Sequence, residues 1–199
     1  IIVCAGSNAQ LTEEYIDSVL AHFGAGDVML VQNEVNNVPY IIRQAKARGM
    51  TVAFNASPIT ASILSYPLEL VDYYLVNETE GRTLSGCGAT DYETILAALH
   101  EKFPAAAIVL TVGSDGVLYQ CGEERYSHGI YRVQAVDTTG AGDTFCGFFL
   151  ASLARGLSVP QALEKASLAS ALAVSRAGAC DSIPTWAEME AFAKTAQAK

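Results

Sequence analysis

The amino-acid sequence predicts an α/β protein that has a mostly parallel central sheet with helices on both faces. Apolar runs of strand length alternate along the chain with helical patterns of about 10–15 residues, and this alternation is typical of βαβ units. The runs are nearly continuous, as expected for strands buried on both faces. The chain has 199 residues, of which 51% are hydrophobic and 17% are charged. That length and composition suit a sizeable core, and we expect a single α/β domain over residues 1–199.

The first half of the chain contains four predicted strands with helical segments between them. The strands are expected at residues 1–5, 28–31, 50–54 and 71–76. Thr12 is a suitable N-cap for a helix whose expected apolar face comprises Tyr15, Ile16, Val19, Leu20 and Phe23. A second helix is expected to end at Gly49. A short helical segment is expected before the fourth strand.

The second half begins with the pattern Thr90-Asp91-Tyr92-Glu93, which we interpret as a capping box that opens a helix. A strand at residues 107–112 then leads into a glycine turn at 113–116. Three shorter antiparallel strands are expected at residues 117–120, 125–127 and 130–133. Later helices are expected to end near Arg155, to run from a capping box at Ser158 to about Arg176, and to begin at Thr185.

Composition excludes several classes of function. A net charge of −9 makes nucleic acid an improbable partner, because a phosphate backbone needs a basic surface. No apolar run approaches the roughly 20 residues of a membrane span, and no signal peptide is visible. The five scattered cysteines form no CxxC pair, so we expect free thiols in the cytoplasm. The first residue is Ile1 and not methionine, so we expect that the natural protein starts upstream.

The most informative stretch is Asp137-Thr138-Thr139-Gly140-Ala141-Gly142-Asp143-Thr144-Phe145, which precedes an apolar helical pattern. A glycine-rich loop that opens a helix forms an anion site, because unpaired amides and the positive end of the helix dipole point toward the ligand. A carboxylate at that position would repel the anion, and this favours a role for Asp143 as a general base. The alternative is that Asp143 merely caps the helix.

Other polar residues follow predicted strands, at the edge of the sheet where this architecture binds ligands. They are Gln32-Asn33-Glu34, Asn55, Asn77 to Glu80 and Thr111 to Gly116. Asn77 and Glu80 would share one helical face and suit a divalent cation held through water, although a solvated helix start is the alternative. The turn at 113–116 could hold phosphate or be a simple hairpin. The sequence contains no P-loop motif, and the Gly140–Gly142 pair is no dinucleotide fingerprint.

The stretch at 137–145 resembles the second signature of the ribokinase-like carbohydrate kinases, also known as the pfkB family. Three further segments resemble motifs of this family in the same order. They are the NxxE motif at Asn77-Glu78-Thr79-Glu80, the nucleotide-side turn at Val112-Gly113-Ser114-Asp115-Gly116-Val117, and the cation loop at Ala173-Val174-Ser175-Arg176-Ala177-Gly178-Ala179 with Ser182 and Pro184. Ala5-Gly6-Ser7-Asn8 and Leu11-Thr12 are most similar to ribokinase members.

The resemblance implies a three-layer ribokinase-like sandwich and ATP-dependent phosphorylation of a sugar hydroxyl, with ribose or a related sugar as substrate. It implies that Asp143 is the base and contacts the sugar, and that the amides of Gly140, Ala141, Gly142 and Asp143 form the anion hole. The remaining implied roles are magnesium–phosphate contact by Asn77 and Glu80, nucleotide contact by Thr111, Gly113, Gly116 and Ser167, a sugar contact by Glu34, and monovalent cation binding by Asp137, Thr139, Arg176 (backbone), Gly178 and Ser182. The implied cofactors are ATP, Mg²⁺ and K⁺.

The chain departs from the family at its start. The resemblance implies that family members have roughly a hundred further residues before the point where this sequence begins. Those residues carry the Gly-Gly sugar motif and a lid that often forms a dimer. We therefore expect a fragment that comprises the C-terminal two-thirds and has little activity alone, and the alternative is a degenerate, naturally truncated family member. The alternatives are a fructokinase, a nucleoside kinase or a 2-keto-3-deoxygluconate kinase, and, from another class, a non-catalytic nucleotide-binding regulatory module.

Overall fold

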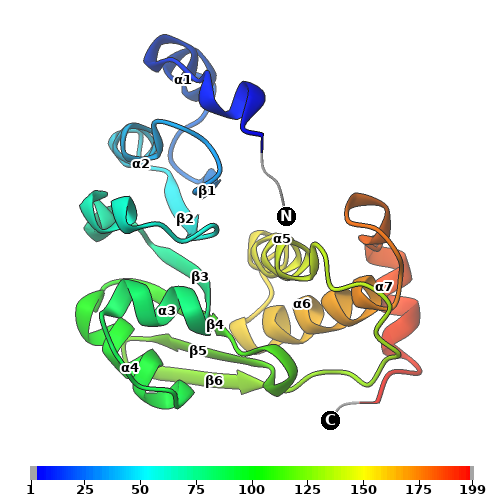
Figure 1. Ribbon diagram of the computed structural model, residues 1–199. Helices are drawn as coiled ribbons and strands as arrows, with labels where there is room; N and C mark the ends of the chain where they lie inside the picture. The colour runs from blue at the N-terminus through cyan, green and yellow to red at the C-terminus, as the bar shows by residue number, and fades with distance from the viewer. Residues whose placement is uncertain (1–3, 198–199) are drawn as a thin grey trace. The chain divides into compact units, whose positions relative to one another are not determined.

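The computed structural model describes residues 4–197 (Figure 1). The chain forms two compact units. The first unit comprises the chain up to Leu110 together with Tyr119–Glu124, and the second comprises Thr111–Leu118 and the chain from Arg125 onward. Each unit is described by itself below. The expectation of a single domain over residues 1–199 stays a prediction.

The sheet has six strands in the order β1-β2-β3-β4-β5-β6, which is also their order in the sequence. The strands are β1 (Val28–Gln32), β2 (Thr51–Asn55), β3 (Tyr73–Asn77), β4 (Ala107–Thr111), β5 (Val117–Cys121) and β6 (Glu124–His128). β1 pairs in parallel with β2, which pairs in parallel with β3. The connection from β4 to β5 is too short for a parallel crossover, so these neighbours are antiparallel. The predicted α/β class and mostly parallel sheet are therefore confirmed.

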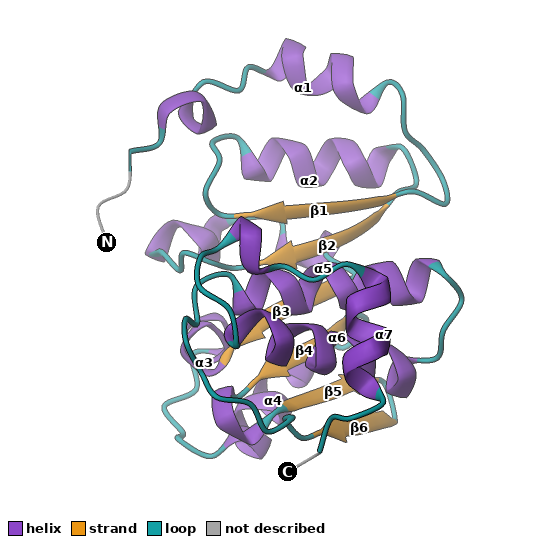
Figure 2. Cartoon of the chain, turned by 90° about the vertical axis from the view of Figure 1, so that its right-hand side faces the viewer, coloured by secondary structure: helices purple, strands orange, loops and turns teal. Residues whose placement is uncertain are grey.

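In the first unit, helix α2 (Val38–Ala47) lies between helix α1 (Glu13–Leu20) and the strands β1 and β2 in both views (Figures 1 and 2). Ile42 and Ala45 of α2 are fully buried, as are Val52 and Phe54 of β2. Burial of these side chains is the main force that holds such a helix on its sheet. The predicted N-cap is confirmed, because the Thr12 hydroxyl accepts the Tyr15 N–H.

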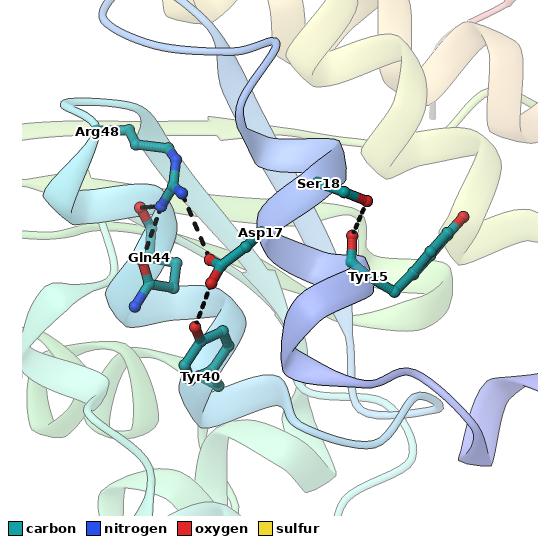
Figure 3. Close-up of polar contacts among 6 residues, drawn as sticks. All are labelled: Tyr15, Asp17, Ser18, Tyr40, Gln44 and Arg48. Carbon is teal, nitrogen blue, oxygen red and sulfur yellow. Dashed lines mark hydrogen bonds and ion pairs between the residues drawn. The ribbon is translucent and has the colours of Figure 1, made fainter.

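A polar network joins α1 to α2 (Figure 3). Asp17 of α1 accepts a hydrogen bond from the Tyr40 hydroxyl at 2.7 Å and pairs with the Arg48 guanidinium at 3.4 Å. Arg48 in turn donates to the carbonyl and side-chain oxygens of Gln44. The hydrogen bond to Asp17, with burial, raises the pKa of Tyr40 to about 12, so its hydroxyl remains a donor at neutral pH.

Two further helices complete the first unit, α3 (Glu78–Ser85) and α4 (Tyr92–Lys102). They approach closely at Gly81 of α3. A Cβ atom at Gly81 would lie 3.0 Å from the Ile95 side chain and 3.2 Å from the side chains of Leu99 and Leu110. Glycine at this position therefore permits the close packing of α3 against α4 and β4.

Replacing Gly81 with valine is expected to lower the free energy of unfolding by about 2–3 kcal/mol, because the added methyl groups overpack a filled core. Gly147→Ala is the matched control. Gly147 also lies within a helix, but nothing lies within 4 Å of an added Cβ, so alanine there is expected to stabilise by up to about 1 kcal/mol. Urea unfolding measures both changes, and equal effects of the two substitutions would contradict the packing account.

The second unit contains helices α5 (Ala141–Ala154), α6 (Val159–Val174) and α7 (Trp186–Ala193). A buried cluster joins them: Tyr131 packs with Leu168, Ala169 and Ala171 of α6 and with Met189 of α7. Phe148 of α5 stacks on Trp186 of α7 with ring centroids 5.6 Å apart. The predicted capping boxes at Ser158 and Thr185 are both present.

Three local predictions need correction or lie outside the described residues. The predicted strand at 130–133 is wrong, because only Tyr131 forms a bridge and its side chain packs against α6 and α7 instead of continuing the sheet. Helix α4 is capped by Asp91 and not by Thr90, since the Asp91 carboxylate accepts the Thr94 N–H at 2.8 Å. Of the predicted strand at 1–5, residues 1–3 lie outside the described residues and residues 4–5 have no strand structure.

Candidate active site

The predicted catalytic stretch forms the start of α5. Gly140 is the N-cap, with φ of 73° and ψ of 4°, a left-handed conformation that glycine adopts without strain. Asp143 is the third residue of the helix and is exposed, so the alternative that Asp143 is the N-cap is wrong. The first hydrogen bond of the helical ladder runs from the Thr144 N–H to the Gly140 carbonyl at 2.8 Å. The amides of Gly142 and Asp143 precede this bond and therefore lie outside the ladder, at the positive end of the helix dipole.

Two of the other first-turn groups have internal partners. The Ala141 N–H donates to the Thr138 carbonyl at 3.2 Å. The Ala141 carbonyl accepts a hydrogen bond from the Ser170 hydroxyl of α6 at 3.1 Å. The Thr144 hydroxyl is buried and has no protein partner. The start of α5, which carries Asp143, is thus hydrogen-bonded to α6.

Asp137 connects the loop before α5 to the loop after α6. Its Oδ1 accepts the Thr139 N–H at 2.9 Å, and its Oδ2 accepts the Gly178 N–H at 3.2 Å. The Asp137 N–H donates to the Val174 carbonyl at 3.2 Å. Hydrogen bonds from Thr139 and then Gly178 lower the pKa of Asp137, so this side chain is a carboxylate at neutral pH. Three of the predicted cation-binding residues, Asp137, Thr139 and Gly178, are therefore brought together.

The two remaining predicted cation ligands lie in the same part of the second unit. Ser182 is fully buried, and its hydroxyl donates to the Ala179 carbonyl at 2.7 Å. Ala179 also lies beside Gly140, where a Cβ would be 3.7 Å from its backbone. The Arg176 guanidinium forms an ion pair with the Glu188 carboxylate at 2.8 Å. Only the backbone of Arg176 is therefore a candidate cation ligand. The donor set is one carboxylate with carbonyl and hydroxyl oxygens, which chemically fits a large monovalent cation.

The capping contacts of Glu188 with Thr185, followed by its ion pair with Arg176, make the stability of α7 dependent on pH. The backbone and side chain of Thr185, followed by Arg176, lower the pKa of Glu188 from 4.5 to about 2. The unfolded chain binds more protons between these values, so the contribution of Glu188 is fully present above pH 4.5 and is lost as pH falls through about 2. We expect Glu188→Gln to flatten the acid-unfolding curve in this window. An unchanged slope, measured by circular dichroism between pH 2 and 5, would contradict this account.

The predicted nucleotide turn connects β4 to β5. Residues Gly113–Asp115 form one turn of 3₁₀ helix, and the Val112 N–H donates to the Gly116 carbonyl at 2.9 Å. Gly116 has φ of 103° and ψ of −129°, and a Cβ there would overlap the carbonyl oxygen of His128 at the end of β6. The prediction that this segment is a hairpin turn is therefore confirmed. Its contact with a nucleotide stays a prediction. Ser167, predicted to lie near the adenine, is buried on α6.

In the first unit, Asn77 and Glu80 form a capping box at the start of α3. The Asn77 side chain accepts the N–H groups of Thr79 and Glu80, and Glu80 Oε2 accepts the Asn77 N–H at 2.9 Å. The solvated alternative does not hold for Glu80, which is only 5% exposed. Burial raises the pKa of Glu80, while hydrogen bonds from Asn77 and from the Ser57 hydroxyl oppose that shift. The side-chain oxygens of Asn77 and Glu80 already accept hydrogen bonds from the backbone. These two residues are therefore better suited to contact the water shell of Mg²⁺ than to bind the ion directly.

Glu34 lies in the turn after β1 and is exposed, as a substrate contact must be. Its neighbour Asn33 bonds the loop after β2: the Asn33 N–H donates to the Ser57 carbonyl at 2.9 Å, and its amide donates to the Pro58 carbonyl at 2.7 Å. Sequence reasoning missed the part played by Asn33 and Ser57. The Asn-Ala-Ser-Pro stretch is typical of a strand break, and nothing local in the sequence indicates that the Ser57 carbonyl accepts the Asn33 N–H.

The predicted site residues thus form two sets. Glu34, Asn77 and Glu80 belong to the first unit, where Asn77 is the last residue of β3 and where Glu34 and Glu80 follow the ends of β1 and β3. Asp137 to Asp143, Ser167, Arg176, Gly178, Ser182 and the turn from Thr111 to Gly116 belong to the second. Among the residues that the structure describes, no cluster of three or more histidine, cysteine or acidic side chains could bind a metal, and no helix has the length and apolar character to cross a membrane.

The family model described as pfkB family carbohydrate kinase matches residues 2–186. Among curated proteins, the chain is 34% identical to a ribokinase of Haemophilus influenzae over 96% of this chain and 64% of that protein. It is 30% identical to a deoxyribokinase of Salmonella typhi over 93% of this chain and 62% of that protein. The chain therefore spans somewhat less than two thirds of the length of these relatives.

Solved structures show the same relationship. A ribokinase of Arabidopsis thaliana, complexed with ribose and ATP, superposes with a TM-score of 0.84 at 26% identity. The match covers 97% of this chain and 64% of the Arabidopsis chain. The ribokinase-like fold predicted from the sequence motifs is confirmed by this likeness.

Proposed function

The chain belongs to the pfkB family of carbohydrate kinases, and we propose that the whole protein transfers the γ-phosphoryl group of ATP to a sugar hydroxyl. The observation that carries the proposal is the start of α5, where Asp143 stands exposed at the third helical position directly after Gly140-Ala141-Gly142. A phosphoryl acceptor needs a base for its hydroxyl proton, and the transferring group needs donors for its developing charge. This helix start offers both within four residues.

In this proposal, Asp143 takes the proton of the attacking hydroxyl, and the amides of Gly142 and Asp143 donate to the transferring phosphoryl group. The amides of Gly140 and Ala141 complete the predicted anion hole only if the Ala141 N–H exchanges its present bond to Thr138 for the phosphoryl oxygen. Thr111, Gly113, Gly116 and Ser167 contact the nucleotide, and Glu34 contacts the sugar. Asn77 and Glu80 orient water on the magnesium–phosphate side.

Two cations are part of the proposal. When bound, Mg²⁺ supplies charge neutralisation at the phosphates. The anchoring of Asp137 to both Thr139 and Gly178 supports a monovalent cation, K⁺ by the resemblance, held by the carboxylate together with oxygens at Thr139, Arg176, Gly178 and Ser182. Such a cation would stabilise the loop that carries Gly140.

We infer that the sugar is ribose or a related sugar, because the relatives include a ribokinase and a deoxyribokinase. A fructokinase, a nucleoside kinase and a 2-keto-3-deoxygluconate kinase are the enzyme alternatives. We also infer cytoplasmic action, in keeping with free thiols at all five cysteines, and homodimer formation through the family's lid.

A sugar panel tests the proposal. The full-length protein is incubated with MgATP and each of ribose, deoxyribose, fructose, 2-keto-3-deoxygluconate and a nucleoside, and ADP release is followed in a coupled assay. We expect turnover with ribose or deoxyribose, and much lower activity for the 199-residue chain alone. Binding of MgATP without sugar-dependent ADP release would favour the regulatory module instead.

A further inference from the structure

An ion pair joins the proposed cation loop, residues 173–184, to helix α7. The Arg176 guanidinium donates to Glu188 Oε1 at 2.8 Å. Two residues further along the loop, the Gly178 N–H donates to Asp137 Oδ2 at 3.2 Å. The loop is therefore held at two points, by the Arg176 side chain on the side of α7 and by the Gly178 main chain on the side of the segment before α5.

Glu188 is itself held in a defined orientation at the start of α7. Its second oxygen, Oε2, accepts the N–H and the hydroxyl of Thr185, each at 2.7 Å. These contacts form part of the capping box of the helix. Because one oxygen holds the cap, the other is presented to Arg176 from a fixed direction. An ion pair with a side chain that is already held costs less rotamer entropy than a pair between two mobile side chains.

Helix α7 packs against α5, the helix whose start forms the proposed anion hole. Phe148 of α5 stacks on Trp186 of α7 with 5.6 Å between ring centroids, and the guanidinium carbon of Arg155 lies 4.2 Å from the centre of the Trp186 ring. Met189 of α7 is fully buried. Glu188 therefore connects the cation loop to a helix that is docked on α5.

The cation loop carries proposed ligands at the two points where it is held. Arg176 would contribute its carbonyl oxygen, and Gly178 follows it by two positions. Residues that hold the ligands of a metal site in place raise its affinity, because the ligands are then ordered before the ion binds. The Arg176 main chain is held to α6 by the bond from its N–H to the Ala173 carbonyl at 3.0 Å. The ion pair with Glu188 holds the same residue to α7.

We propose that Glu188 is a positioning residue of the proposed monovalent cation site: its carboxylate anchors the Arg176 side chain to α7 and so holds the Arg176 carbonyl in place for the ion. This inference rests on the proposed function, and it assigns a role to a residue that does not itself touch the cation. It implies that loss of the ion pair weakens K⁺ binding, while the reaction at saturating K⁺ proceeds nearly as before.

The test uses the full-length protein with Glu188→Gln, Arg176→Gln, the double variant and the matched control Glu190→Gln. Glutamine suits the third position of a capping box, so Glu188→Gln removes the charge pair and keeps the start of α7. Glu190 lies on the same helix, and among the described contacts its carboxylate accepts only the Trp186 indole N–H at 2.9 Å.

Two measurements are made on each variant. Binding is followed as the rise in unfolding temperature that K⁺ causes beyond that caused by choline at equal ionic strength. Because each variant is compared with itself, a general loss of stability does not enter this difference. Activity is followed as the K⁺ concentration that gives half of the maximal rate of sugar phosphorylation.

We expect Glu188→Gln and Arg176→Gln each to weaken K⁺ binding about threefold, the size of effect that a partly exposed ion pair supplies. The double variant should also lose about threefold and not about ninefold, because the two residues act through one contact. In Glu188→Gln, kcat at saturating K⁺ should change by less than about twofold, since no group that touches the substrate is altered. Glu190→Gln should bind K⁺ like the wild type.

Three outcomes would overturn the inference. The first is K⁺ binding by Glu188→Gln that equals that of the wild type. The second is a loss in the double variant that equals the product of the two single losses, which would show that Arg176 and Glu188 act separately. The third is an equal loss in Glu190→Gln, which would show that K⁺ binding follows the general stability of α7.

The binding measurement also separates this inference from the proposed function. If the wild type phosphorylates no sugar on the panel, the kinase proposal fails, while the K⁺-dependent unfolding temperatures still decide the role of Glu188. If K⁺ raises the unfolding temperature of the wild type no more than choline does, the cation site and this inference fail together, and the sugar panel still decides the kinase proposal.

Discussion

Replacing Asp143 with asparagine in the full-length protein is expected to lower kcat about a hundredfold or more, with only a small change in the unfolding midpoint. Asparagine preserves the size of the side chain at the third position of α5 but cannot accept the proton of the sugar hydroxyl. Base catalysis by a positioned carboxylate contributes about 10²- to 10⁴-fold to such reactions. Because the residue is exposed and the N-cap is Gly140, the substitution does not remove a cap. Single-turnover measurements would locate the loss in the chemical step.

Asp27→Asn is the matched control for this prediction. Asp27 is also an exposed aspartate, and its carboxylate accepts only the Gly24 N–H at 2.8 Å among the described contacts, in the turn before β1. Its variant should keep kcat within about twofold. Near-normal turnover by Asp143→Asn would remove Asp143 from the role of base. A kcat loss that tracks a lower unfolding midpoint would instead assign Asp143 a structural role in α5.

The elements that the sequence predicted well are those with local causes. The strands β2, β3 and β4 were visible because most of their side chains are buried and so form continuous apolar runs. β1 is also an apolar run, although its Val28 and Leu30 are exposed. The helix starts at Thr12, Ser158 and Thr185 were visible because a cap and its partner lie within four residues of each other. The strand predicted at 130–133 failed because Tyr131 and its neighbours are apolar for another reason, packing against α6 and α7.

The same distinction applies to the candidate site. The roles proposed for Asp143 and Glu80 follow from motifs that are continuous in sequence, and the structure places each at a helix start as those motifs require. The family resemblance implied that Asp137 and Gly178 bind the same cation, and this role stays a prediction. The structure places the two residues together, 41 positions apart in sequence, through a hydrogen bond from the Gly178 N–H to Asp137. The hydrogen bond between the Asn33 N–H and the Ser57 carbonyl had no such signal, because it arises from the alignment of two neighbouring strand ends in the folded sheet.

Replacing Gly116 with alanine is expected to destabilise the second unit by about 3 kcal/mol or more and to weaken MgADP binding at least tenfold. A φ of 103° with a ψ of −129° is nearly closed to residues that carry a Cβ atom. The added methyl group would also overlap the His128 carbonyl, which is backbone and cannot rotate away. The turn must therefore move as a whole, and the proposed nucleotide contacts at Thr111 and Gly113 move with it.

Gly113→Ala is the control variant. It separates the effect of the steric overlap at Gly116 from the general cost of replacing a glycine in this turn. Gly113 lies in the same turn with φ of 56°, but nothing lies within 4 Å of an added Cβ. Its alanine variant should lose only about 1–2 kcal/mol, the cost of a left-handed conformation. Urea unfolding and calorimetric titration with MgADP measure both variants. If the two variants unfolded at the same urea concentration, the close approach of β6 to the turn would not be what requires Gly116. If Gly116→Ala were destabilised but bound MgADP normally, the turn would be a structural hairpin, and the nucleotide would be held by other residues of the second unit.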